Sequence, residues 1–140
     1  MAEITINGSI LTKEDLFPIF KKNIGSNYPE NEGWKVYNRF NWVSYLHDFV
    51  LQREVGEKVE RIVVEINTDR KITQEQINQL NIVANRLSSE DVTVIKKILI
   101  IKKEAEVNSI PQDFEVFYLN EFLTGTKQAR SKEDKDKLVA

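Results

Sequence analysis

Residues 59–103, VERIVVEINTDRKITQEQINQLNIVANRLSSEDVTVIKKILIIKK, decide the fold, because they predict a strand, a helix and a second strand. The flanking parts, 59–67 and 92–103, are rich in β-branched residues, and the aliphatic centre of the second part predicts burial on both faces. Between them, Thr73 is a helix cap and Gln76 completes its capping box. A strand–helix–strand unit of this length predicts two parallel, neighbouring strands.

The residues before this unit predict one helix and two further strands. Residues 11–25 predict the helix, with Gly25 as its end. Its cap is Thr12, or Asp15 if Pro18 is to fall in the first turn. Residues 34–42 and 44–54 are rich in aromatic and β-branched side chains, which is typical of strands. Short turns connect these strands to the one at 59–67, so we expect the first three strands to be antiparallel.

With a fifth strand at 114–119, the chain predicts an α/β fold of one domain. A mixed sheet is flanked by helices in the order helix, strand, strand, strand, helix, strand, strand. The domain is expected to span residues 1–125. Residues 126–140 are charged and contain few apolar side chains before the last three positions, which predicts a disordered tail.

Composition excludes several kinds of site. The 140 residues include no cysteine, which excludes disulfides, thiolate metal ligands and a cysteine nucleophile. The single histidine, His47, excludes a zinc site built from several histidines. The net charge of −2 lacks the basic surplus of many nucleic-acid-binding proteins, although local fields differ from the total.

No stretch of the sequence predicts membrane insertion or export. The first ten residues lack the basic and apolar regions of a signal peptide. The apolar run at 98–101 is far too short to cross a bilayer. We therefore expect a cytoplasmic protein with no membrane partner.

One carboxylate, Glu65, stands in the middle of the aliphatic strand 59–67. If residues 56–57 form a two-residue hairpin loop, Asp48 lies directly opposite Glu65, with Cβ atoms roughly 5 Å apart. His47 should then point to the opposite face. Protonation or a cation such as Mg²⁺ would relieve the repulsion between the two carboxylates. Without metal, we expect Asp48→Asn to stabilise the protein.

The stretch HDFVLQREVGEKVERIVVEIN, residues 47–67, resembles the core of the PD-(D/E)XK nuclease superfamily, which has the restriction-endonuclease-like fold. The family pattern has an acidic residue on the second core strand, then an acid, any residue and lysine on the third. Asp48 matches the first acid and Glu65 the second, whereas Asn67 stands where lysine is expected. The order of elements between about residues 12 and 119 is also similar.

The resemblance implies a Mg²⁺- or Mn²⁺-dependent nuclease that hydrolyses phosphodiester bonds of DNA or RNA, and also implies a homodimer. Asp48 and Glu65 would hold the metal, which polarises the phosphodiester and lowers the pKa of a bound water. Asn67 would complete the catalytic set by positioning a water, without the charge of lysine. Glu14, on the first helix, is a candidate third acid.

Two alternatives stay open. A catalytically inactive binding or assembly subunit would keep the nuclease fold without the lysine. An unrelated α/β domain would carry Glu65 on the wet face of a strand, as the alternation of polar and apolar residues over 62–67 predicts. Further candidates for contacting nucleic acid are Trp34 and Trp42, which otherwise belong to the core, and Lys71, Lys96, Lys97, Lys102 and Lys103.

Overall fold

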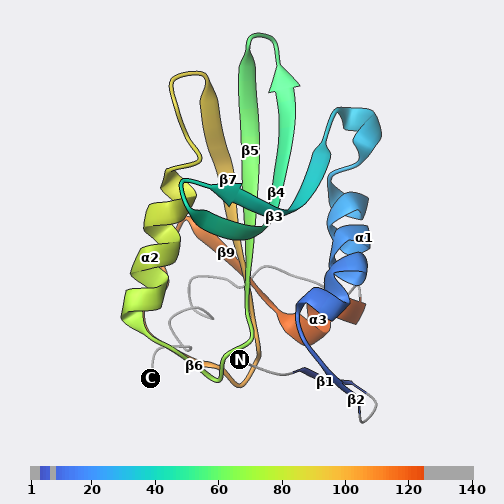
Figure 1. The fold of residues 1–140 in the computed structure, drawn as a ribbon, viewed down its shortest axis with the longest axis vertical. Helices are drawn as coiled ribbons and strands as arrows, with labels where there is room; N and C mark the ends of the chain where they lie inside the picture. The colour runs from blue at the N-terminus through green and yellow to red at the C-terminus, as the bar shows by residue number, and fades with distance from the viewer. Residues whose placement is uncertain (1–3, 7–8, 125–140) are drawn as a thin grey trace.

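The computed structural model describes residues 4–6 and 9–124. Its centre is a mixed five-stranded sheet in the order β3-β4-β5-β7-β9 (Figure 1). Strands β3, β4 and β5 are antiparallel to their neighbours, whereas β5, β7 and β9 are parallel. The expected parallel pairing across the helix is therefore confirmed. The strands are β3 (Lys35–Trp42), β4 (Tyr45–Val55), β5 (Lys58–Asn67), β7 (Val92–Ile101) and β9 (Phe114–Tyr118).

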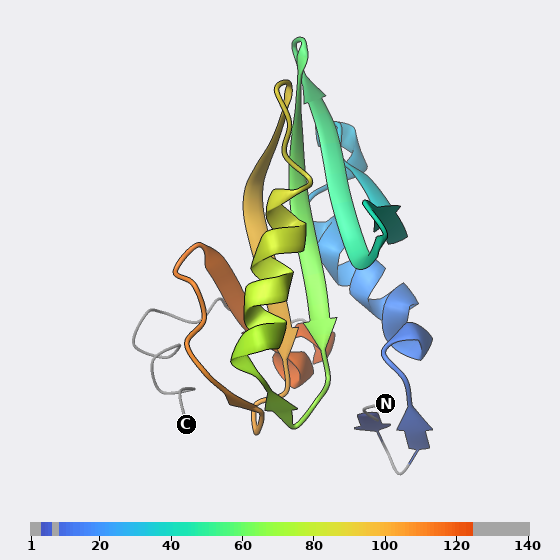
Figure 2. The same ribbon diagram turned by 60° about the vertical axis from the view of Figure 1, so that its left-hand side comes forward.

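Helices cover both faces of this sheet, which gives three layers (Figures 1 and 2). Helices α1 (Phe17–Asn27) and α3 (Leu119–Thr124) pack on one face, and α2 (Gln74–Asn85) packs on the other. Strand β5 contributes alternate residues to the two cores, with Val64 under α1 and Val63 under α2. Both faces of the strand are thus buried. The helices in the described part of the chain are too short and too polar to span a membrane.

The predicted helix signals are confirmed at α2 and in part at α1. Thr73 and Gln76 form the reciprocal capping box of α2. Thr12 also bonds reciprocally with Asp15, but this box begins a short 3-10 turn, η1 (Glu14–Leu16), ahead of α1. Helix α1 runs past Gly25 to Asn27, so the predicted end is wrong by about half a turn.

The structure adds short elements that the sequence did not predict. β1 (Ile4–Ile6) pairs antiparallel with β2 (Ser9–Leu11), and β6 (Lys71–Ile72) pairs in parallel with β8 (Glu106–Val107). A 3-10 turn, η2 (Glu30–Glu32), precedes β3. Strands of two or three residues are too short to show periodicity. The predicted tail, residues 126–140, lies outside the described residues.

The β4–β5 hairpin has the predicted register. Val55 pairs with Lys58 around the two-residue loop, and Gly56 has the positive φ (64°) that the first position of this loop requires. The described ladder continues in register as far as Phe49 and Val64. Asp48 and Glu65 would come next, and the regular pairing stops there.

Candidate functional site

A pocket of about 240 Å³ lies at the carboxyl end of β5. Four segments form its wall: the turn before α1, the start of β4, the end of β5 with the residues that follow it, and Leu80 of α2. Both acids of the predicted site line this one pocket. The lining residues are Thr12, Lys13, Glu14, Tyr45, Leu46, Asp48, Glu65, Ile66, Asn67, Thr68, Asp69 and Leu80.

Glu65 is a buried acid and does not lie on a wet face of the strand. Its residue is 3% exposed, and its carboxylate oxygens contact His47 Nδ1 at 2.8 Å and the Tyr45 hydroxyl, which donates, at 3.2 Å. Burial raises the pKa of Glu65, and the nearby charge of Asp48 adds to the rise, whereas the hydrogen bond with His47 opposes it. The expectation of a wet strand face is therefore wrong, because α2 covers this side.

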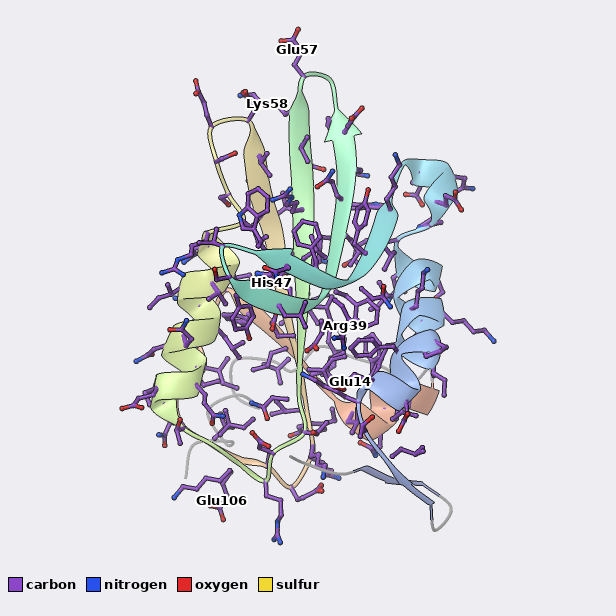
Figure 3. The ribbon with its side chains drawn as sticks, viewed as in Figure 1. Glu14, Arg39, His47, Glu57, Lys58 and Glu106 are labelled. Carbon is purple, nitrogen blue, oxygen red and sulfur yellow. The ribbon has the colours of Figure 1, made fainter. Side chains whose placement is uncertain are left out.

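Of the neighbouring β4 residues His47 and Asp48, it is His47 that contacts Glu65, together with Tyr45 of the same strand. Phe49 packs under α1, so regular alternation would place His47 on that same face. The contact with Glu65 shows that the alternation reverses between His47 and Phe49. The neighbouring strand is irregular at the same level, where Arg39 has a left-handed φ of 53° (Figure 3). The prediction that His47 points away is wrong because it assumed an unbroken pleat.

Asp48 turns its carboxylate to the main chain of β5. Its Oδ2 accepts a hydrogen bond from the Ile66 N–H at 2.8 Å, in place of a backbone partner from β4. Lys13 Nζ lies 3.0 Å from Asp48 Oδ1 and 3.2 Å from Oδ2, and it also donates to the Ile66 carbonyl at 3.2 Å. Burial raises the pKa of Asp48, although Lys13 and the Ile66 N–H oppose the rise. Asp48, Ile66 and Lys13 thus form a closed ring of contacts.

Lys13 and Tyr45 contact the two acids of the pocket, and neither was predicted from the sequence to belong to the site. The predicted helix began before Lys13, and a lysine in a first turn usually points into water. In the structure, Lys13 precedes the short turn η1 and reaches back to the end of β5. Glu14 was a candidate acid for the site, and it does line the pocket. Because Lys13 is its neighbour in the sequence, the same reasoning could have placed Lys13 near the site.

Asn67 is among the residues that line the pocket, but its amide oxygen has a local partner. Asn67 Oδ1 accepts a hydrogen bond from the Asp69 N–H at 2.9 Å, which fixes the chain as it leaves β5. Glu14 is exposed at the rim of the pocket, and its charge contributes to the raised pKa of Asp48. The positive charge beside Asp48 comes from Lys13, on a different segment of the pocket wall.

The other candidate contacts lie elsewhere in the described structure. Lys96 bonds to the Tyr28 hydroxyl at 3.0 Å, and Lys97 contacts Asp113 at 2.6 Å, so neither serves the pocket. Lys71, Lys102 and Lys103 are also absent from the described pocket wall. Trp34 belongs to the core, as expected. Trp42 does not: it is 40% exposed and donates to the Arg86 carbonyl.

His47 has one paired ring nitrogen and one unpaired. The residue is fully buried, and its ring lies edge-on to Tyr45 with centroids 4.8 Å apart. Nδ1 is paired with Glu65, whereas Nε2 is the one buried side-chain polar atom, among the described residues, without a hydrogen-bond partner. Burial and the charge of Glu65 raise the pKa of Tyr45, so its hydroxyl stays a proton donor to Glu65. Tyr45 and His47 together fix the Glu65 carboxylate.

The two predicted metal ligands therefore have separate partners, Lys13 for Asp48 and His47 for Glu65. Across residues 4–6 and 9–124, no group of three or more His, Cys, Asp and Glu side chains is placed to hold a metal ion. The arrangement places the Asp48 carboxylate beside an ammonium, and a buried acid with a raised pKa, Glu65, in the same pocket. None of the family models, curated proteins or solved structures compared with this chain matches it.

Proposed function

We propose that the pocket is the active site of a Mg²⁺- or Mn²⁺-dependent nuclease that hydrolyses phosphodiester bonds of DNA or RNA. The observation that carries the proposal is the convergence of oxygen atoms on the Lys13 ammonium: both carboxylate oxygens of Asp48 and the carbonyl of Ile66. These oxygens already surround a positive charge. Carboxylate and carbonyl oxygens are also the ligands of hard divalent cations, so this donor set fits the implied metal.

A restriction-endonuclease-like fold is part of the proposal. It is supported by the succession α1, β3, β4, β5, α2, β7, which is similar to the element order of the nuclease core. The parallel pairing of β5 with β7 agrees with it as well. The acids also lie at the carboxyl end of β5, where open α/β sheets bind their ligands.

In such a reaction, different residues of the pocket would bind the metal, exchange a proton and supply positive charge. Asp48 and the Ile66 carbonyl would hold the metal, with Glu65 beside them. When bound, the metal would polarise the phosphodiester and lower the pKa of a bound water. Glu65, whose pKa is raised and whose orientation is fixed by hydrogen bonds, is placed to exchange a proton. Lys13 supplies the positive charge that the family pattern puts at position 67.

The test is cleavage of single- and double-stranded DNA and RNA with Mg²⁺ or Mn²⁺. We expect wild type to cleave at least one of these, and Glu65→Gln to abolish cleavage. Lys13→Met should reduce the rate by about a hundredfold, the usual loss for one transition-state-stabilising group. Lys22→Met, which removes the same charge from the exposed surface of α1, is the matched control.

Asn67→Lys provides a second, independent variant. It restores the family pattern on the strand that carries Glu65, so it should increase the cleavage rate of wild type and rescue Lys13→Met. If neither wild type nor Asn67→Lys cleaves any nucleic acid with either metal, the enzyme proposal is abandoned.

A catalytically inactive binding or assembly subunit is the second candidate. One observation favours it: each acid already has a protein partner, Lys13 for Asp48 and His47 for Glu65. Fluorescence anisotropy with labelled DNA and RNA separates the two candidates. The inactive subunit would bind without cleaving, and Glu65→Gln would leave its affinity unchanged.

A further inference from the structure

We propose that Lys13 is a tethered cation, which occupies the position of the divalent metal and leaves it when the metal binds. The inference rests on the proposed function, because it concerns the same site. An ammonium group has three N–H donors. Lys13 directs its ammonium at Asp48 Oδ1, Asp48 Oδ2 and the Ile66 carbonyl, at 3.0, 3.2 and 3.2 Å. Asp48 Oδ2 and the Ile66 carbonyl accept hydrogen bonds from the ammonium, and Asp48 Oδ1 lies at ion-pair distance from it.

The protein needs a positive charge at this position. The N–H of Ile66 bonds to Asp48, and its carbonyl lies where the described β4–β5 ladder has already ended. Asp48 is 8% exposed, and a buried carboxylate without a cation or donors is costly. Lys13 satisfies the carbonyl and the carboxylate together. A divalent cation would satisfy the same two groups.

Lys13 and a divalent cation exclude each other at these oxygens. Two positive charges within about 4 Å repel strongly where solvent is partly excluded, and the ammonium already fills the space between the acceptors. A metal that binds Asp48 must therefore displace Lys13.

Lys13 is also able to leave. Its side chain is 33% exposed, compared with 10% for that of Asp48, and it has a flexible four-carbon stem. Its backbone precedes a short 3-10 turn, not a packed helix, and the residue borders the pocket of about 240 Å³. The displaced ammonium stays beside the pocket, where an anionic phosphodiester would meet it. The same lysine thus protects Asp48 without metal and becomes available to substrate with metal.

The direct test is residue-resolved amine labelling of wild type by acetic anhydride, with and without Mg²⁺, read by mass spectrometry. Releasing a partly exposed ion pair should raise the labelling rate of Lys13 by roughly fivefold. Lys22, on the exposed surface of α1, is the internal reference and should not change. In Asp48→Asn, Lys13 should label quickly without Mg²⁺ and should not respond to it.

Calorimetric titration with Mn²⁺ separates this inference from the proposed function. Lys13→Met should bind Mn²⁺ roughly five- to tenfold more tightly than wild type, whereas Lys22→Met should bind as wild type does. Equal or weaker binding by Lys13→Met, or Lys13 labelling that stays constant or falls with Mg²⁺, would overturn the inference and leave the metal site standing. If neither wild type nor Lys13→Met binds Mn²⁺, both proposals fail.

Discussion

The two ends of β4 hold their charges in different ways. Near its carboxyl end, Arg53 lies directly opposite Glu60 of β5, and the side chains form an ion pair of 2.8 Å within a regular ladder. At its amino end, continuing the same register would place Asp48 directly opposite Glu65, so that two acidic side chains would face each other. There the ladder stops, His47 faces Glu65, and Asp48 pairs with Lys13 from outside the sheet. The regular ladder thus includes the opposite charges of Arg53 and Glu60, and it ends before the two acids would face each other.

The hairpin turns at these two ends also differ, one being formed by a residue suited to its backbone conformation and the other not. The turn to β5 has Gly56 at its positive-φ position, where glycine has no steric penalty. The turn from β3 has Val43 and Ser44 at φ values of 49° and 59°, a conformation that is unfavourable for a β-branched residue. The end of β4 that carries the pocket therefore also carries backbone strain.

The largest expected effect is at Asp48. Asp48→Ala leaves the buried Ile66 N–H without an acceptor and Lys13 without its ion pair, so we expect a loss of about 3 kcal/mol in the free energy of unfolding. Glu54→Ala, at the exposed end of the same strand, should change it by less than about 0.5 kcal/mol. Urea denaturation measures both, and equal losses would contradict the comparison.

The structure also reverses the expectation for Asp48→Asn. From the sequence, the substitution relieves repulsion and stabilises the protein. In the structure it removes the charge that Lys13 contacts, so we expect it to cost about 1 kcal/mol. An increase in stability would show that repulsion from Glu65 outweighs the pairing with Lys13.

The second prediction concerns pH and Glu65. Because its folded pKa is raised above the ordinary value of 4.5, protonated Glu65 favours the folded state. This contribution is fully present below pH 4.5 and is lost as pH rises through the folded pKa. The Gln side chain of Glu65→Gln does not ionise, so the variant keeps this contribution at every pH. Its free energy of unfolding should therefore rise relative to that of wild type as pH increases, by up to about 1.4 kcal/mol per pH unit. A constant difference between pH 4.5 and 7 would mean that Glu65 does not change its protonation in the folded state over this range.

The regular end of β4 was predictable from sequence because local signals determine it. Gly56 specified the loop, the loop specified the register, and the register held as far as Phe49. The capping box at Thr73 was likewise contained within four residues. Such signals depend only on neighbours in the chain.

The pocket end was not predictable in the same way, because distant segments determine it. The side-chain alternation of β4 reverses near Asp48, at the level where Arg39 of β3 has a left-handed φ. A left-handed conformation is uncommon for residues other than glycine, so the sequence does not predict it. Burial of Glu65 requires α2 to cover the strand, and alternation over residues 62–67 carries no information about a covering helix. Lys13 reaches Asp48 across 35 residues of sequence.

The third prediction tests the strain at the β3–β4 turn. Val43→Asn with Ser44→Gly introduces the dipeptide that two successive positive-φ residues favour. Val43 is exposed, so little burial is lost, and we expect the free energy of unfolding to increase by about 1 kcal/mol. Thermal or urea denaturation measures the gain. Placing Asn and Gly at the matched positions of the other turn, by Gly56→Asn with Glu57→Gly, should give no comparable gain, because no strained residue is relieved there.

The smallest expected effect is the coupling between Arg53 and Glu60. Both side chains are about one-third exposed, at 32% and 28%, so water and salt weaken their attraction. A double-mutant cycle should give about 0.5 kcal/mol, and most of it should disappear in 1 M salt. The same cycle for Lys13 and Asp48 should give about 1 kcal/mol and retain more of it in salt, because the Asp48 side chain is only 10% exposed. Equal couplings with equal salt dependence would mean that the burial of Asp48 adds nothing to its pairing, and that Lys13 is an ordinary surface lysine.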